Sequence, residues 1–296
     1  MKKNWKNRAR RTFAWTGSVL VVLAVVLVVL GSMKLNEVLR PPRRISSGTV
    51  LAQWHIPYQS VDLMTDDGVP LSAWYTPSRN GAVILVAHSF RDHRPEWVYE
   101  MLVRKGYGVL AWDARAHGKS GGEISTIGYA EVLDVKAALK YVQVQPGVAH
   151  IGAWGGSMGG STLIRAAVQF PQIEALFVDS AFPSLSEEFD YLIPYPVVSP
   201  FAKLLMQVEM GVNVNDVNPE ADIAKISPRP VFVAQGTADS AEPPDSAERL
   251  FKAANEPRFL WTEKSVTHMG LYFDNPRRYQ RRLIDFFDVW LLKKKV

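Results

Sequence analysis

From about residue 50 to the end of the chain, short uninterrupted apolar runs alternate with stretches whose apolar residues recur every three or four positions. Uninterrupted runs are typical of strands buried on both faces of a sheet, and the spaced residues are typical of amphipathic helices. The expected strands are a hairpin over 60–65 and 70–77, then 81–88, 107–113, 148–154, 174–181, 229–236 and 258–263. The expected helices are 96–106, 129–143, 159–170, 245–255 and 277–294. The alternation predicts an α/β fold with a doubly wound, mostly parallel sheet and helices on both faces.

One segment interrupts this alternation. Residues 182–228 are rich in proline and aromatic residues, and we expect them to form a small helical cap inserted between two strands. The apolar side chains of this cap suit an uncharged or acyl-bearing substrate. They fit equally well with a cap that merely packs on the sheet, so the sequence leaves both interpretations open.

The N-terminal segment has a different pattern. No charged residue occurs from Thr12 to Met33, a run of 22 residues with an aliphatic centre. As a helix it would be roughly 33 Å long, which is close to the thickness of the hydrocarbon layer of a bilayer. We therefore expect a transmembrane helix over 12–33, with a basic tail at 1–11, a stalk at 34–49 and a globular domain at 50–296 that includes the cap.

Charge predicts the orientation of this helix. Six positive charges precede the apolar run, so the positive-inside rule places the N-terminus in the cytosol and the globular domain outside, on a single-pass plasma-membrane protein. A signal peptide cleaved after Gly31 is the alternative. The apolar run exceeds the usual ~7–15 residues of a signal-peptide core, which favours an uncleaved signal-anchor.

The same basic tail explains the net charge of +5. Ten of the 34 Lys and Arg residues lie within residues 1–44, together with one acid, and the rest of the chain is slightly acidic. A nucleic-acid partner is therefore not expected. Cysteine is absent, which excludes disulfides, thiolate catalysis and cysteine-ligated metals.

The segment "AWGGSMGG" (153–160) places one serine among four glycines, between an expected strand and an expected helix. Such a stretch is either a plain turn or a nucleophile elbow, Gly-x-Ser-x-Gly, which presents a serine at a tight strand-to-helix turn. The flanking strand and helix favour the elbow and make Ser157 the candidate nucleophile.

A serine hydroxyl needs a base, and that base needs a carboxylate partner. Of the six histidines, His268 lies in a loop between the last expected strand and the last expected helix, and it is the candidate base. Asp239 follows the end of a buried strand and is the candidate acid. Their chain order, Ser…Asp…His, is the order expected for this elbow. The alternative acids are Glu242, Asp216 and Asp222.

An acyl-transfer site also needs donors for the developing oxyanion. We expect the backbone N–H groups of Met158, directly after the serine, and of Phe90, in the loop after the strand at 81–88. His88 in that loop is expected to hold the loop in place. This mechanism needs no metal and no cofactor.

Several motifs together resemble the α/β-hydrolase superfamily. The motifs are, in order, "TDDGVPLSAWYTP", "VILVAHSF", "AWDARAHGKSGG", "GGSMGG", "PVFVAQGTAD" and "THMG". Over residues 50–292 the chain looks most like the single-domain members grouped with serine aminopeptidases and prolyl-oligopeptidase-type hydrolases. The resemblance implies an α/β-hydrolase fold in which Ser157, Asp239 and His268 form the catalytic triad.

The chain departs from the family pattern at two loop positions. Ala116 replaces a glycine of the structural loop that begins at Asp113, and Ser89 replaces the glycine of the His-Gly oxyanion loop. The neighbouring segment "RDHR" (91–94) is unusually charged. It either contacts an anionic or polar part of the substrate or is simply solvated.

The expected function is hydrolysis of an ester-type acyl bond of a small acyl substrate, as in a carboxylesterase. A peptidase or an acyltransferase would use the same triad, and a non-catalytic binding protein would share only the fold. The sequence shows no recognisable pair of acids suited to holding the amino terminus of a peptide, which favours an ester over a peptide.

Overall fold

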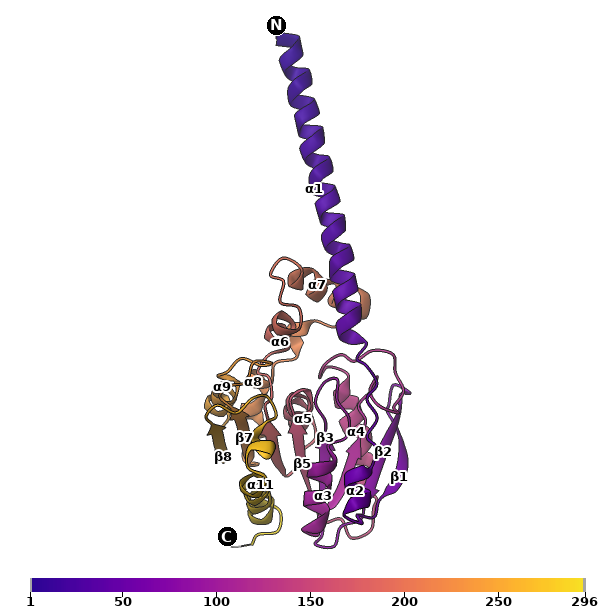
Figure 1. Ribbon diagram of the computed structural model, residues 1–296, viewed down its shortest axis with the longest axis vertical. Coiled ribbons are helices and arrows are strands. Elements are labelled where there is room, and N and C mark those ends of the chain that lie inside the picture. The colour runs from indigo at the N-terminus through magenta and orange to yellow at the C-terminus, as the bar shows by residue number, and fades with distance from the viewer. Residues whose placement is uncertain (1, 295–296) are drawn as a thin grey trace.

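The computed structural model describes residues 2–294 and contains one eight-stranded sheet (Figure 1). The strand order is β1-β2-β4-β3-β5-β6-β7-β8. The strands are β1 Gln59–Met64, β2 Pro70–Thr76, β3 Ala82–Ala87, β4 Gly108–Trp112, β5 His150–Gly156, β6 Ala175–Asp179, β7 Val231–Gly236 and β8 Arg258–Glu263. β1 and β2 are antiparallel to their neighbours, and β3 to β8 are parallel. The predicted α/β fold with a mostly parallel sheet is confirmed.

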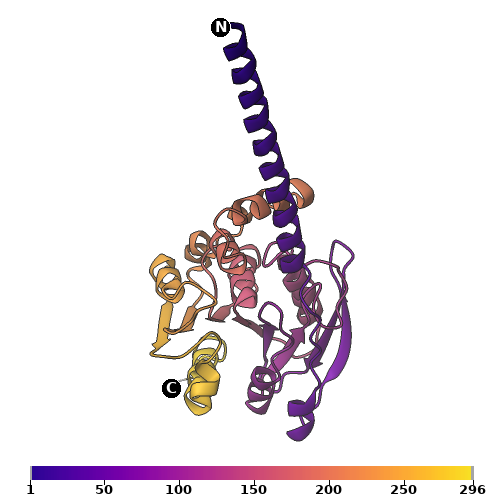
Figure 2. The ribbon, with the colours of Figure 1, turned by 45° about the horizontal axis from the view of Figure 1, so that its top comes forward.

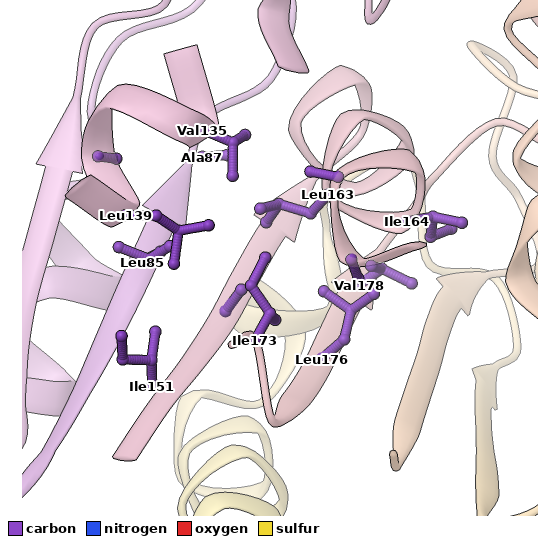
Figure 3. Packing of buried hydrophobic residues seen from close by; sticks show 14 of the residues in the cluster. Leu85, Ala87, Val135, Leu139, Ile151, Leu163, Ile164, Ile173, Leu176 and Val178 are labelled. Carbon is purple, nitrogen blue, oxygen red and sulfur yellow. The ribbon is translucent and has the colours of Figure 1, made fainter. Parts of the chain in front are cut away.

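Helices cover both faces of the sheet. One face packs against α4 (Glu131–Gln143), α5 (Met158–Gln169) and α9 (Ser246–Ala253), and the other packs against α3 (Glu96–Arg104) and α11 (Pro276–Trp290). Figure 3 shows part of the first interface, where Leu85, Ile151 and Leu176 of the strands face apolar side chains of α4 and α5. Strands buried on both faces require apolar residues at nearly every position, which explains the uninterrupted runs.

Two short helices have no counterpart among the predicted elements. They are α2 (Thr49–Gln53) and α10 (Leu271–Asp274). Each is about one turn long, so neither contains enough residues to show helical periodicity in the sequence.

The cap lies between β6 and β7, as expected. It contains α6 (Leu185–Leu192), α7 (Ser199–Met210), a 3-10 turn η1 (Val214–Asp216), α8 (Pro219–Asp222) and a second 3-10 turn η2 (Ile223–Ile226). Because β6 and β7 are parallel neighbours, an insertion after β6 starts at the edge of the sheet where the parallel strands end. The cap therefore covers the edge at which Ser157 lies.

The N-terminal helix α1 runs without a break from Lys2 to Leu39 (Figure 1). Its segment Thr12–Leu39 is long and apolar enough to cross a membrane, with a mean hydropathy of 2.7 over its most apolar window. By length and composition this segment fits a membrane anchor or a signal sequence.

The segment 34–49, expected to be a stalk, is folded onto the domain. Its first six residues complete α1, in which Leu35, Val38 and Leu39 are buried against the cap. Farther on, the Glu96 carboxylate accepts hydrogen bonds from the Ser46 hydroxyl and from backbone N–H groups nearby. The three apolar residues follow the spacing i, i+3, i+4, so this part of α1 is amphipathic and has an apolar side to bury.

Candidate active site

Ser157 lies alone between the end of β5 and the start of α5, in a strained turn. Its backbone has φ +49° and ψ −121°, a conformation that costs an L-residue about 1–3 kcal/mol. The turn is tight because a Cβ atom on Gly155 would lie 2.6 Å from the backbone of Gly159, and a Cβ on Gly159 would collide with the carbonyl of Ala87. The glycine cluster therefore forms the expected strand–turn–helix.

Asp239 and His268 meet beside this turn. The His268 Nδ1 lies 2.8 Å from Asp239 Oδ2, so Nδ1 carries the proton that the carboxylate accepts. The other oxygen of Asp239 accepts the backbone N–H groups of Ala241 at 3.0 Å and Glu242 at 3.1 Å. The Asp239 side chain is fully buried, whereas 24% of the His268 side chain is exposed. This arrangement leaves Nε2 of the imidazole available for proton transfer.

The surroundings of His268 stabilise its protonated form. Burial by itself would lower the pKa of the imidazole. The hydrogen bond to Asp239 and the charge of that carboxylate act in the opposite direction, and the carboxylates of Asp179 and Glu188 add to them. The net effect raises the pKa of His268 above its ordinary value of 6.5.

The hydroxyl of Ser157 forms a hydrogen bond with Glu242 and not with His268. Its Oγ donates a hydrogen bond to Glu242 Oε1 at 3.4 Å. Within residues 2–294 no hydrogen bond joins Ser157 Oγ to the imidazole of His268. The structure thus brings the three expected triad residues to one edge of the sheet and forms the Asp239–His268 pair, but the serine rests against an acid that was expected only as an alternative to Asp239.

Glu242 belongs to a buried pair of carboxyl groups that sequence analysis missed. Its partner is Glu188 of α6, and both residues are more than nine-tenths buried. Burial is the main cause that raises the pKa of each, and the nearby carboxyl of Glu188 raises that of Glu242 further. One oxygen of each, Oε2, has no hydrogen-bond partner in the described chain. The two carboxyl groups therefore retain their protons more readily than exposed carboxyl groups do.

A signal for Glu188 was present in the sequence. Leu185, Glu188, Phe189 and Leu192 follow the spacing i, i+3, i+4, i+7, so an acid stands within the apolar stripe of an amphipathic helix. Such a residue is buried with the stripe and needs a polar partner. Only the folded chain shows that this partner is Glu242, which is 54 residues away.

The loop after β3 is held by two neutral histidines. His88 donates from Nδ1 to the Ser89 carbonyl at 2.7 Å and accepts the Ala114 N–H at Nε2. His117 accepts the Arg91 N–H at 3.1 Å. Burial lowers the pKa of both imidazoles to about 4, so both stay uncharged near pH 7. His88 thus has the structural role expected for it.

The two backbone groups expected to stabilise an oxyanion belong to Met158, next to Ser157, and to Phe90, which follows Ser89; a Cβ on Gly156 would lie 3.1 Å from Ser89 Oγ. In the part of the chain that the structure describes, the N–H groups of Phe90 and Met158 have no hydrogen-bond acceptor. Met158 is the first residue of α5, where the helix dipole also favours negative charge. Two free donors at this place suit a developing oxyanion.

The charged segment 91–94 is partly structural: its two arginines make contacts within the protein, while the side chains of His93 and Asp92 are 38% and 46% exposed. Arg94 is buried, lies 3.1 Å from the buried carboxylate of Asp113 and packs 4.0 Å over the ring of Trp74. Arg91 lies over the Phe90 ring and donates to the carbonyl of Glu37 in α1. Arg94 therefore neither contacts a substrate nor is solvated, because its charge is neutralised inside the domain.

A second buried network supports the loop that carries His268. The indole of Trp154 donates to the hydroxyl of Tyr279, which donates to the Asp179 carboxylate at 2.9 Å. The next residue, Ser180, accepts the backbone N–H of Met269 at 3.2 Å. Burial raises the pKa of Asp179 to about 6. The network ties β5, β6 and α11 to the residue directly after His268.

The remaining candidates lie elsewhere. His150 pairs with Glu174 at 2.8 Å at the start of β5, the end of the strand opposite Ser157. Asp222 pairs with Lys225, and Asp216 ends the turn η1. Among residues 2–294 there is no group of three or more His, Cys, Asp or Glu side chains arranged to hold a metal ion.

Comparison with known proteins agrees with this architecture. A family model described as "Serine aminopeptidase, S33" matches residues 78–220. The Mycobacterium tuberculosis (strain CDC 1551) protein MT2364 is 31% identical over 71% of this chain and 72% of its own length. Escherichia coli K12 YfhR is 27% identical over 77% of this chain and 80% of its own.

A solved structure is also similar. The esterase Pf2001 of Pyrococcus furiosus superposes with a TM-score of 0.73 at 27% identity, covering 85% of this chain and 99% of that one. An open, mostly parallel sheet with a serine at a strand–turn–helix defines a hydrolase of the α/β type. The chain belongs to the α/β-hydrolase superfamily.

The pairing with Asp239 predicts how His268 titrates. The imidazole of His268 should titrate above pH 6.5, and in Asp239→Asn its pKa should fall, because the amide is neutral. Since the folded-state pKa is raised, this pair stabilises the fold below pH 6.5, and the stabilisation is lost as pH rises through the folded-state pKa. Histidine NMR of the full-length protein in detergent measures the pKa, with His268→Gln for assignment and His150 as the internal control. An unchanged His268 pKa in Asp239→Asn would contradict the prediction.

Proposed function

We propose that the protein is a serine hydrolase that cleaves ester-type acyl bonds through Ser157, His268 and Asp239. The observation that carries the proposal is the 2.8 Å Asp239–His268 pair beside a serine held in a strained turn at the carboxyl edge of the sheet. The fold and the 27% identical esterase Pf2001 support it. That archaeal protein is named an esterase; for this chain, ester hydrolysis is our proposal.

In the proposed mechanism, Ser157 Oγ attacks the acyl carbonyl carbon while its proton passes to Nε2 of His268. Asp239 holds the Nδ1 proton and stabilises the imidazolium. The backbone N–H groups of Phe90 and Met158 bind the oxyanion of the tetrahedral intermediate. His268 then protonates the departing alcohol, which leaves an acyl-enzyme on Ser157. Water, activated by the same imidazole, releases the acid.

The free enzyme must rearrange at one point before attack. Ser157 Oγ donates to Glu242 at 3.4 Å, a long bond, and rotation about the Cα–Cβ bond of the serine is needed to direct the hydroxyl toward His268. Catalytic hydrogen bonds are often long or misaligned before substrate binds. Substrate that occupies the space beside Glu242 would favour the rotated state.

The proposal predicts the effect of removing either group. Ser157→Ala and His268→Ala should each lower kcat for p-nitrophenyl acetate by about 10³-fold or more, since the two residues act as a unit. The full-length protein in detergent is assayed, and labelling by a fluorophosphonate should occur in the parent and not in Ser157→Ala. The control is Ser161→Ala, a buried serine one turn along α5 that bonds to the Phe182 carbonyl. Equal rates in all variants would refute the triad.

The buried carboxyl pair favours a second candidate function, an aminopeptidase. An amine next to the scissile carbonyl would displace the proton held by Glu188 and Glu242 and form an ion pair with their carboxylates. The unpartnered Oε2 atoms of both residues support this reading. The Glu188–Glu242 pair revises the expectation drawn from the sequence, in which no pair of acids suited to holding the amino terminus of a peptide was recognisable. Ester cleavage remains the primary proposal.

Two substrates separate these functions. An aminopeptidase should cleave alanine p-nitroanilide, and Glu188→Gln should lower kcat/KM for this amide by about tenfold or more, because one partner of a buried ion pair is lost. The control is Glu187→Gln, since Glu187 is half-exposed and binds Arg249. If the parent cleaves p-nitrophenyl acetate and leaves the anilide intact, the aminopeptidase is rejected and the esterase is retained.

We also propose that α1 anchors the protein in the plasma membrane, with the N-terminus in the cytosol and the hydrolase domain outside. The apolar segment Thr12–Leu39 and the six preceding basic residues support this topology. An alkaline phosphatase fused after residue 40 should be active in cells. If alkaline phosphatase were inactive there and a reporter that requires the cytosol were active at the same position, the proposed orientation would be wrong.

A further inference from the structure

The cap has an apolar outer surface. Five of its large apolar side chains face solvent, among them Val208 with 73% and Leu204 with 54% of its surface exposed; the others are Tyr191, Tyr195 and Val197. Leu204 and Val208 are one turn apart on the same side of α7. No charged residue occurs from Tyr191 to Ala202. We call these five side chains the outer cap surface.

The α7 helix, which carries Leu204 and Val208 of the outer cap surface, lies beside α1 (Figures 1 and 2). A Cβ atom on Gly31 would lie 3.2 Å from Phe201 and 3.3 Å from Leu205, so a glycine lets α1 and α7 pack at close range. One turn farther, Leu35 and Leu39 of α1 share an apolar cluster with Ala202 and other cap residues. The α1 helix and the cap therefore form one packed unit.

The length of α1 places this contact at the surface of a bilayer. The 20 residues from Thr12 to Gly31 span about 30 Å as a helix, which equals the thickness of the hydrocarbon layer. The next charged residue is Lys34, which pairs with Glu37 at 2.7 Å, and Tyr195 of the cap lies near it. Tyrosines beside the first charges are typical of a membrane interface. The outer cap surface is thus level with the end of the membrane-spanning segment.

We propose that the outer cap surface is immersed in the lipid interface from which α1 emerges, and that the site takes its acyl ester from the bilayer. The part about the substrate rests on the proposed hydrolase function and membrane anchor. The inner side of the same cap carries Phe189 and Glu188, and Glu188 contacts Glu242 beside Ser157. The cap therefore has the outer cap surface on one side and the reactive hydroxyl on the other.

The position of the surface is measured directly by single-cysteine labelling, because the chain has no cysteine. Leu204→Cys and Val208→Cys are labelled with an NBD fluorophore in the full-length protein in phosphatidylcholine nanodiscs. Both labels should emit at the short wavelength of an apolar environment, and doxyl-labelled phosphatidylcholine should quench them. The control is Val144→Cys, since Val144 is 78% exposed at the end of α4, away from the cap.

Delivery from the bilayer is tested with two esters in the same nanodiscs. The double variant Leu204→Glu/Val208→Glu should lower hydrolysis of bilayer-dissolved 4-methylumbelliferyl oleate by about tenfold relative to soluble p-nitrophenyl acetate, or about 1.4 kcal/mol. Hydrolysis of the soluble ester should be unchanged, because both residues are exposed and lie outside the site. The matched control, Val144→Glu, should change neither rate.

The outcomes separate the two proposals. Labels at 204 and 208 that behave like the label at 144 overturn the membrane contact. Labels shielded from water but not quenched by the lipid quencher also overturn it, since another protein copy then covers the surface. Equal loss on both esters in the double variant, or no loss on either, overturns delivery from the bilayer. If the parent hydrolyses neither ester, the hydrolase proposal fails, while the labelling still decides where the surface lies.

Discussion

The close approach of two backbone segments is the constraint on which the site depends. The first turn of α5 lies against the end of β3, and only glycine at position 159 permits this, since a Cβ there would collide with the Ala87 carbonyl. The approach forces Ser157 into its strained conformation and places the N–H of Met158 near the loop that carries Phe90. A serine, a helix N-terminus and a second free donor therefore meet because two chain segments share a space too small for side chains.

A cluster of carboxyl groups is the second organising feature of this edge. Asp239, Asp179, Glu188 and Glu242 lie around one imidazole, and each of these carboxyl groups is almost fully buried. Asp239 accepts hydrogen bonds from three donors besides His268, which suits the partner of an imidazolium. Burial raises the pKa of the other three carboxyl groups, so they retain protons more readily. The environment thus selects Asp239 from a set of similar acids.

The third feature is the continuity of apolar contacts from α1 to the site. One cluster contains Leu35 and Leu39 of α1, Phe189 of the cap and Met158 of α5. Because interiors are densely packed, this cluster forms continuous packing from α1 through the cap to the residue next to Ser157. The N-terminal helix is therefore part of the support of the site as well as a candidate anchor, and any truncated form that lacks Leu35 and Leu39 loses part of this support.

Elements that depend on local pattern could be predicted from the amino-acid sequence. Buried parallel strands require uninterrupted apolar runs, so the runs at 81–88 and 229–236 predicted β3 and β7, and a glycine-flanked serine between strand and helix predicted the turn at Ser157. The pairing of Asp239 with His268 followed from the rule that parallel strands end at one edge. Contacts between distant segments left no such local pattern. The folded chain was needed to show that Glu188 contacts Glu242 and that Asp113 neutralises Arg94. It was also needed to show that residues 34–39 pack on the cap instead of forming a stalk. The physical reason is that the periodicity of apolar positions shows which side chains are buried. Which residue a buried side chain contacts depends on the packing of the whole chain.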